Sequence, residues 1–395
     1  METDIPERQD RLAPLGFHAN LVAYLQQEEP AVWAWSQSAD VRQQQAEETR
    51  QAILHQTYRL ERDSHPDVYS ACEEAMIKLG IDARVTLYQA ADGMMNASLC
   101  FIPNEVHIIF YGPIFERLSA EELTAVMGHE LSHYRLWMAD GGHYYNASRI
   151  LDHALSYPDA TPAQRETARL LSLYTELYAD RGAAVVADAV GPAIAVLVKT
   201  MTGITSVDPE AYLRQAEELE KTADRSEGHS HPEVFLRARA LDHWWREVEG
   251  VDGWVDQRIR GPISIESLDM LRQEELTKLT RSFFARFAAE VGMQSEAVLT
   301  QMRRYFPQLI ETDTKIDLDE IGPEKIDDPT RSYFIALMFD CAMADPEVRD
   351  EVMLAAAKTA RSMGAESLFA AALKRDLKWT KAATDKLISN AAKAA

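Results

Sequence analysis

Residues 129–133 read His-Glu-Leu-Ser-His, and this stretch decides how the rest of the chain is interpreted. Ser119 and Glu122 form a Ser-x-x-Glu capping box upstream, which predicts a helix that begins here and carries the stretch. Histidines four residues apart project from one face of a helix, so His129 and His133 are able to share one zinc ion. The pattern also arises by chance, in which case both histidines are ordinary core or surface residues.

Glu130 lies between the two histidines and is expected to point toward the open side of such a metal ion. Water bound to zinc is acidified by the metal, and a neighbouring carboxylate is able to deprotonate it. The product is a hydroxide-like nucleophile aimed at a carbonyl carbon. The stretch therefore indicates metal-assisted hydrolysis.

A catalytic zinc site needs a third protein ligand and one open position. Glu176 and Asp180 are four residues apart, within a segment from 170 to 186 that is dominated by Leu, Tyr, Ala and Val. On a helix the Glu176 carboxylate is able to complete a set of two histidines and one glutamate. Asp180 is then placed to accept the second ring N–H of a zinc-bound histidine. The alternative interpretation is a solvated helix face.

The His-Glu-x-x-His stretch followed by Glu176-x-x-Ala-Asp resembles the HtpX and CAAX-prenyl endopeptidase family of zinc metallopeptidases, within the gluzincins. The resemblance covers about residues 66 to 245. Further matches follow in the family's order: Asn96-Ala97, Gly112, Leu118-Ser119, Ser230-His231-Pro232 and Arg237.

The resemblance implies one zinc ion, held by His129, His133 and Glu176. It implies that Glu130 acts first as general base and then as general acid, and that Asp180 orients His129. The expected fold is a gluzincin core, and the expected activity is that of a zinc metalloendopeptidase acting on a peptide or protein substrate.

The resemblance also places His231 and Arg237 near the cleft. They would be oxyanion or substrate contacts, or a brace for the helix that carries Glu176; alternatively, His231 is simply a residue at a helix N-terminus before a proline. Asn96 and Ala97 are expected to bind substrate. The strand around Ala97 would be the upper edge of the cleft and pair with an extended peptide, or it is an ordinary strand of a small sheet.

The chain has 395 residues, enough for two or three domains, and almost all of it reads as helix. Residues 81–111 carry the only convincing strands, so the predicted fold is mainly α with a small β-sheet. The predicted parts are an N-terminal helical segment (1–65), the metallopeptidase core (66–249) and a C-terminal helical region (263–395). Linkers are expected at 250–262 and 311–328, and residues 329–395 resemble a TerB-like helical domain.

The formal net charge of −22 argues against nucleic acid and against an anionic bilayer surface as partners. Three scattered cysteines favour a reducing compartment. Residues 1–11 are charged and show no signal peptide. The apolar stretch 182–198 is too short to cross a bilayer and predicts two buried helical pieces with a break at Gly191-Pro192. We therefore expect a soluble, cytoplasmic protein without integral membrane association, unlike many members of the family.

Two alternatives to an active zinc metalloendopeptidase stay open at this level. The first is a latent protease whose N-terminal helices, or whose loop at 226–232, cover the cleft until a partner moves them. The second is a non-catalytic zinc-binding scaffold whose helical C-terminal region binds a protein partner. In that scaffold His231 would close the metal site as a fourth ligand.

Overall fold

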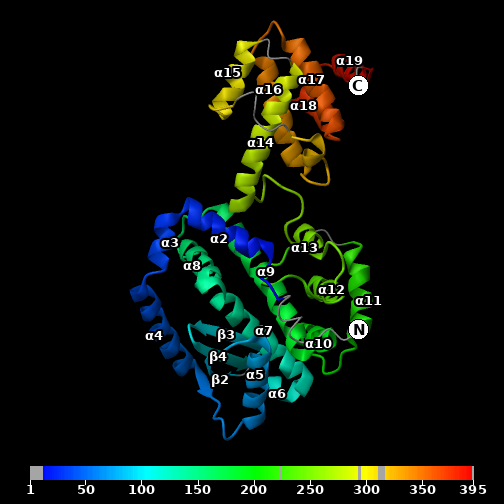
Figure 1. Cartoon of the computed structure of the whole chain (residues 1–395). Coiled ribbons are helices and arrows are strands. Elements are labelled where there is room, and N and C mark those ends of the chain that lie inside the picture. The colour runs from blue at the N-terminus through cyan, green and yellow to red at the C-terminus, as the bar shows by residue number, and fades with distance from the viewer. Residues whose placement is uncertain (1–11, 92, 223–224, 292–294, 310–315, 394–395) are drawn as a thin grey trace. The chain divides into compact units, whose positions relative to one another are not determined.

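The structure is a computed structural model that describes residues 12–91, 93–222, 225–291, 295–309 and 316–393. The chain divides into two compact units, Met1–Gly261 and Pro262–Ala395 (Figure 1). It is mainly helical with one small mixed sheet, as predicted. The charged stretch 1–11, and part of the linker expected at 311–328, lie outside the described residues.

The sheet of the first unit has the strand order β1-β2-β4-β3. Its strands are β1 (Thr57–Arg59), β2 (Arg84–Ala90), β3 (Asn96–Ile102) and β4 (Glu105–Tyr111). β4 is an interior strand that pairs in parallel with β2 and antiparallel with β3, and it is buried along most of its length. β3 is an edge strand and only partly buried. β1 was expected to be helical, since three residues are too few to show the alternation of a strand.

Two long helices, α7 (Ala120–Met138) and α9 (Pro162–Ala187), form the centre of the first unit. The capping box predicted at Ser119 is present: the Ser119 hydroxyl accepts from the Glu122 N–H, and the Glu122 carboxylate accepts from the Ser119 N–H. The start of α9 has a capping box of the same kind, formed by Thr161 and Gln164. Local sequence therefore fixes where both helices begin.

Glycines at two places allow α7 and α9 to approach each other closely. A Cβ added to Gly182 on α9 would lie 1.6 Å from the Ser132 Oγ and 2.6 Å from the Ser132 Cβ on α7. A Cβ added to Gly128 on α7 would lie 2.7 Å from the Val186 Cβ on α9. The close approach brings the histidines of α7 next to the carboxylates of α9.

The remaining helices of the first unit surround this pair (Figure 1). They are α2 (Gly16–Glu28), α3 (Pro30–Ser36), α4 (Ala39–Gln56), α5 (Pro66–Leu79), α6 (Ile114–Arg117), η1 (Ala139–Gly142), α8 (His143–Leu155), α10 (Val190–Thr202), α11 (Pro209–Glu220), α12 (Val234–Trp245) and α13 (Val251–Arg260). None of the helices in the described ranges is long and apolar enough to cross a bilayer.

Two boundaries differ from those expected. The apolar stretch 182–198 does form parts of two helices, but the break falls at Asp188, which adopts a left-handed conformation with φ 54°. Gly191 and Pro192 instead lie in the first turn of α10, where a proline is tolerated. The linker expected at 250–262 contains α13, because its glycines at 250 and 261 bound that helix rather than breaking it.

The second unit consists of helices around its own apolar core. They are α14 (Met270–Val291), α15 (Glu296–Tyr305), η2 (Leu318–Ile321), α16 (Asp328–Met343), α17 (Arg349–Ser362), α18 (Glu366–Arg375) and α19 (Lys381–Lys393). Phe283, Phe334 and Phe369 are fully buried in the core, together with alanines of α17 that let the helices pack closely. The TerB-like resemblance of residues 329–395 stays a prediction.

Candidate metal centre and catalytic cleft

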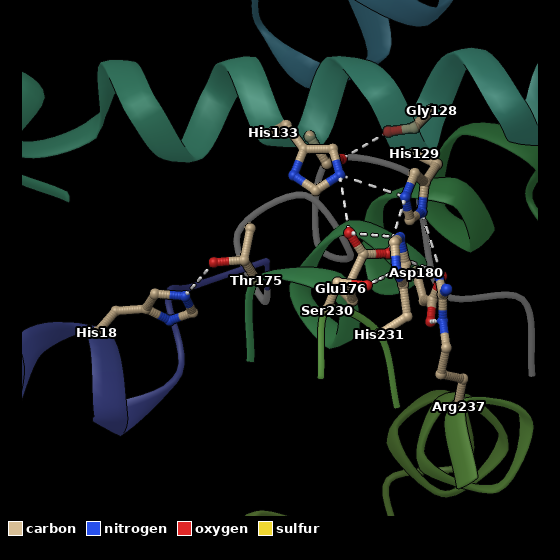
Figure 2. Close-up of polar contacts among 11 residues, drawn as sticks. His18, Gly128, His129, His133, Thr175, Glu176, Asp180, Ser230, His231 and Arg237 are labelled. Carbon is tan, nitrogen blue, oxygen red and sulfur yellow. Dashed lines mark hydrogen bonds and ion pairs between the residues drawn. The ribbon is translucent and has the colours of Figure 1, made fainter. Parts of the chain in front are cut away.

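Three side chains from α7 and α9 converge at one point (Figure 2). The Nε2 atoms of His129 and His133 lie 3.3 Å apart. The Glu176 carboxylate lies 3.4 Å from the first nitrogen and 3.6 Å from the second. Ligands at about 2.0–2.1 Å from a tetrahedral ion are separated by roughly 3.3–3.4 Å, so the three groups fit a single metal ion of this kind. Among the residues that the structure describes, these three are the group whose donor atoms lie close enough together to hold one metal ion.

The state of Glu176 is consistent with a metal ligand. Its Oε2 is buried and accepts no well-aligned hydrogen bond from the described residues, although the Arg237 Nη2 lies 3.0 Å away. A buried carboxylate oxygen without such a bond is costly, and a bound cation would satisfy it. Burial acts to raise the pKa of Glu176, but the positive charges of Arg237 and His129 hold this pKa well below its ordinary value. Glu176 is therefore ionised, as a metal ligand must be.

Asp180 and Arg237 form a buried pair behind His129. The Asp180 Oδ1 lies 3.2 Å from the Nδ1 of His129, on the ring side away from Glu176. Arg237, on α12, donates two hydrogen bonds of 2.7 Å to the two Asp180 oxygens. This arrangement orients the His129 ring so that its Nε2 faces the other donor atoms, which supports the role expected for Asp180. Arg237 is buried and bonded to Asp180 of α9, and it also lines the cleft, so its role as a brace or as a cleft contact stays a prediction.

The two histidines differ in their electrostatic surroundings. Burial lowers the pKa of His133 to about 4, so its imidazole is neutral and ready to bind a metal. Burial also acts to lower the pKa of His129, but the carboxylates of Asp180 and Glu176 raise it to about 10. A metal ion binds the deprotonated form of an imidazole nitrogen, so metal binding at His129 would release a proton.

Glu130 is buried beside these donors and lines the same cleft. Its carboxylate accepts a hydrogen bond from the backbone N–H of Leu99 on the edge strand β3. Burial raises the pKa of Glu130 to about 7. A carboxyl group in this range is able both to take up and to release a proton near neutral pH, as a general base and acid must.

His231 lies in the loop before α12, close to the metal donors but half exposed. Its Nε2 is 3.6 Å from the Glu176 Oε1, and its Nδ1 is 2.9 Å from the Ser230 hydroxyl (Figure 2). A Cβ on Gly228 would lie 2.0 Å from the His231 carbonyl oxygen, so the tight loop requires a glycine there. His231 is outside the group of three donors that fits a metal ion.

The metal donors lie in a cleft of about 550 Å³ between the edge strand and the helices. Asn96 and Ala97 line it from β3, at the positions where substrate contact was expected. Sequence reasoning missed a whole wall of this cleft, formed by Ala193, Val196, Leu197, Thr200 and Met201 of α10. An apolar helix face has the same sequence pattern whether it faces a core or a cleft, so no signal distinguished the two.

The N-terminal helices do not cover this cleft. Every residue that lines it lies at or after Met95, and none comes from the described residues of α2, α3 or α4. A latent protease whose N-terminal helices cover the cleft stays a prediction that this lining does not support. The loop at 226–232 does border the cleft, through His231 and Pro232.

Two histidines and a glutamate on two helices, with a second glutamate beside them and an edge strand alongside, form an arrangement able to hold one metal ion in a cleft. The profile of peptidase family M48 matches residues 64–139 of the chain. The plastoglobule-localized metallopeptidase 48, chloroplastic, of Arabidopsis thaliana is 29% identical over 204 residues. That similarity covers 46% of this chain and only 58% of the relative's length. No solved structure matches the chain.

Proposed function

We propose that the protein is a zinc-dependent metalloendopeptidase. The observation that carries the proposal is the convergence of His129, His133, Glu176 and the Glu130 carboxylate in one cleft beside an edge strand. Two imidazoles and one carboxylate form a donor set that suits zinc and leaves a position open. A bound zinc ion would supply Lewis acidity for the hydrolysis of a peptide bond.

The side chains of this protein then have separate tasks. Glu130 takes a proton from the attacking water and later passes it to the leaving amine. Asp180, held by Arg237, keeps the His129 ring in its binding orientation. His231 lies at the mouth of the cleft, where it is placed to donate a hydrogen bond to the carbonyl oxygen as that oxygen gains negative charge.

The proposed substrate is a peptide segment in extended conformation. The outer edge of β3 has no strand partner among the described residues, and Asn96 and Ala97 lie where it borders the cleft. An added strand would gain backbone hydrogen bonds there, which suits an enzyme that cuts within a chain. A cytoplasmic location is also our proposal, supported by the unpaired cysteines Cys72, Cys100 and Cys341.

The first test compares the zinc-loaded chain with its Glu130→Gln variant on an unfolded, fluorescently labelled protein. We expect the variant to retain one equivalent of zinc and to lose about 10²–10⁴-fold in rate. Glu121→Gln is the matched control, because Glu121 is an exposed glutamate on the same helix. Cleavage by Glu130→Gln at the parent's rate would refute the assigned general base. Absence of cleavage by the parent would count against the proposed activity itself.

A further inference from the structure

A second cavity of about 200 Å³ adjoins the cleft on the side of Trp137. Trp137 lines both cavities, so its side chain is the wall that they share. The second cavity lies among α4, the end of β3, and the helices α7 and α8. Its lining includes Thr49, Phe101, Pro103, Trp137, Tyr145 and Arg149. We call it the Trp137 pocket.

The Trp137 pocket has aromatic walls held in fixed positions. The Phe101 ring lies 4.3 Å from the ring of Tyr145 and 5.5 Å from that of Tyr134. The Trp137 ring lies 6.1 Å from the Tyr145 ring. Gly141 and Gly142 complete the wall, with left-handed backbone angles of φ 65° and φ 85° that favour glycine. Such walls suit an apolar side chain, and the volume corresponds to roughly six or seven water molecules of about 30 Å³ each.

The position of the pocket along β3 relates it to the bond that would be cut. Glu130 accepts its hydrogen bond from Leu99, so Leu99 marks the point on the strand that faces the reacting groups. Phe101 follows two residues later, on the same face of the sheet and about 7 Å farther along. Suppose that a peptide pairs with β3 and that its scissile bond lies next to Glu130. The peptide residue two positions from that bond then lies beside Phe101.

We propose that the Trp137 pocket binds a bulky apolar side chain of the extended peptide substrate, two residues away from the scissile bond. The inference rests on the proposed function and adds a specificity determinant to it. It also gives α4 a part in substrate selection, because Thr49 of α4 lines the pocket.

The test begins with the cleavage sites that the zinc-loaded chain produces in an unfolded protein, mapped by mass spectrometry. Peptides built on one such site then carry either Leu or Gly two residues from the scissile bond, on each side in turn. On one side we expect Leu to be preferred over Gly by about tenfold or more in kcat/KM, as burial of a leucine side chain implies. Thr49→Trp should fill the pocket and abolish this preference, whereas Thr49→Ser should keep it.

The outcomes separate this inference from the proposed function. If the parent cleaves but shows no such preference, or if Thr49→Trp keeps it, the pocket has no role in selection while the peptidase activity stands. If neither peptide nor unfolded protein is cleaved, the proposed function fails and the inference fails with it. Should Thr49→Trp not fold, as judged by circular dichroism, Trp137→Ala provides the second variant and is expected to reduce the same Leu-to-Gly ratio.

Discussion

At the scale of single residues, the metal donors depend on side chains behind them. Asp180 is the clearest case, since it is almost fully buried, contacts the His129 ring from behind and is itself held by Arg237. The spacing of Glu176 and Asp180 on one helix already suggested this division of tasks. The family resemblance offered Arg237 as a possible brace for this helix. Helical spacing alone did not, because Arg237 comes from α12, more than fifty residues farther along the chain.

This leads to a prediction for Asp180→Asn. The variant keeps the size of the side chain but removes the charge that fixes the His129 ring, so zinc affinity should fall about 10–100-fold. Competition with a chromogenic chelator measures the change. Asp159→Asn, at an exposed aspartate of the same unit, is the control and should bind zinc as the parent does. Equal affinity of the Asp180 variant and the parent would show that Asp180 does not orient the ligand.

At the scale of elements, the site depends on the short distance between α7 and α9. We predict that Gly182→Ala destabilises the fold by about 1–3 kcal/mol, because the new Cβ would lie within 2.6 Å of both the Ser132 Oγ and the Ser132 Cβ. Rotation of the serine side chain cannot relieve both contacts. Zinc affinity should fall as well, since α7 and α9 must separate.

Urea unfolding of this variant is best compared with that of Gly253→Ala. Gly253 lies within α13, and nothing lies within 4 Å of a Cβ placed there. An alanine in such an open helical position should be neutral or stabilising by up to about 1 kcal/mol. If Gly182→Ala behaved like Gly253→Ala, the close approach of the two helices would not be required.

The first described helix, α2, is joined to α9 beside the metal donors. The Phe17 ring stacks on Tyr174 at 4.7 Å, and the Nε2 of His18 lies 3.2 Å from the hydroxyl of Thr175. Thr175 directly precedes Glu176. α2 therefore packs against the helix that carries the proposed third ligand, which differs from the covering role considered for a latent protease.

His18 should make stability depend on pH. Burial lowers the pKa of His18 to about 4, so below the ordinary value of 6.5 the unfolded chain takes up a proton that the folded chain does not. The stabilisation is thus complete above pH 6.5 and is lost as the pH falls toward 4. Between pH 7.5 and 5 the parent should lose about 2 kcal/mol of unfolding free energy through this residue.

Denaturant unfolding at both pH values, on the parent and on His18→Gln, measures this contribution. The glutamine variant should show a smaller decrease between pH 7.5 and 5, by the amount given above, because other titrating groups are common to both proteins. An identical decrease in both would mean that His18 does not titrate differently in the folded and unfolded states.

At the scale of the whole molecule, all the site residues lie in the first unit, whereas the second unit has a separate phenylalanine-rich core. We predict that residues 1–261 expressed alone fold, bind one equivalent of zinc and cleave the same unfolded protein as the full chain. Calorimetry, metal analysis and the cleavage assay test this. Loss of zinc binding in the fragment would mean that the first unit requires the second. A protein partner for the second unit stays a prediction.

The sequence by itself determined the parts of this protein that depend on short segments. Capping boxes determine the helix starts at Ser119 and Thr161. Helical spacing pairs the histidines of α7 and the carboxylates of α9. Both signals involve residues only three or four apart. The same spacing allowed the metal donors to be proposed before any three-dimensional information.

Only the tertiary structure decided which segments, distant in sequence, meet at the cleft. Three features depend on long-range packing: the cleft wall formed by α10, the short strand β1, and the Trp137 pocket shared by α4, β3, α7 and α8. The contact of Arg237 with Asp180 also appears only in the structure, although the resemblance had offered Arg237 as a brace. Local sequence patterns do not identify the distant residues against which a side chain packs. For the same reason the glycines around α13 were interpreted as a linker, although they bound a helix.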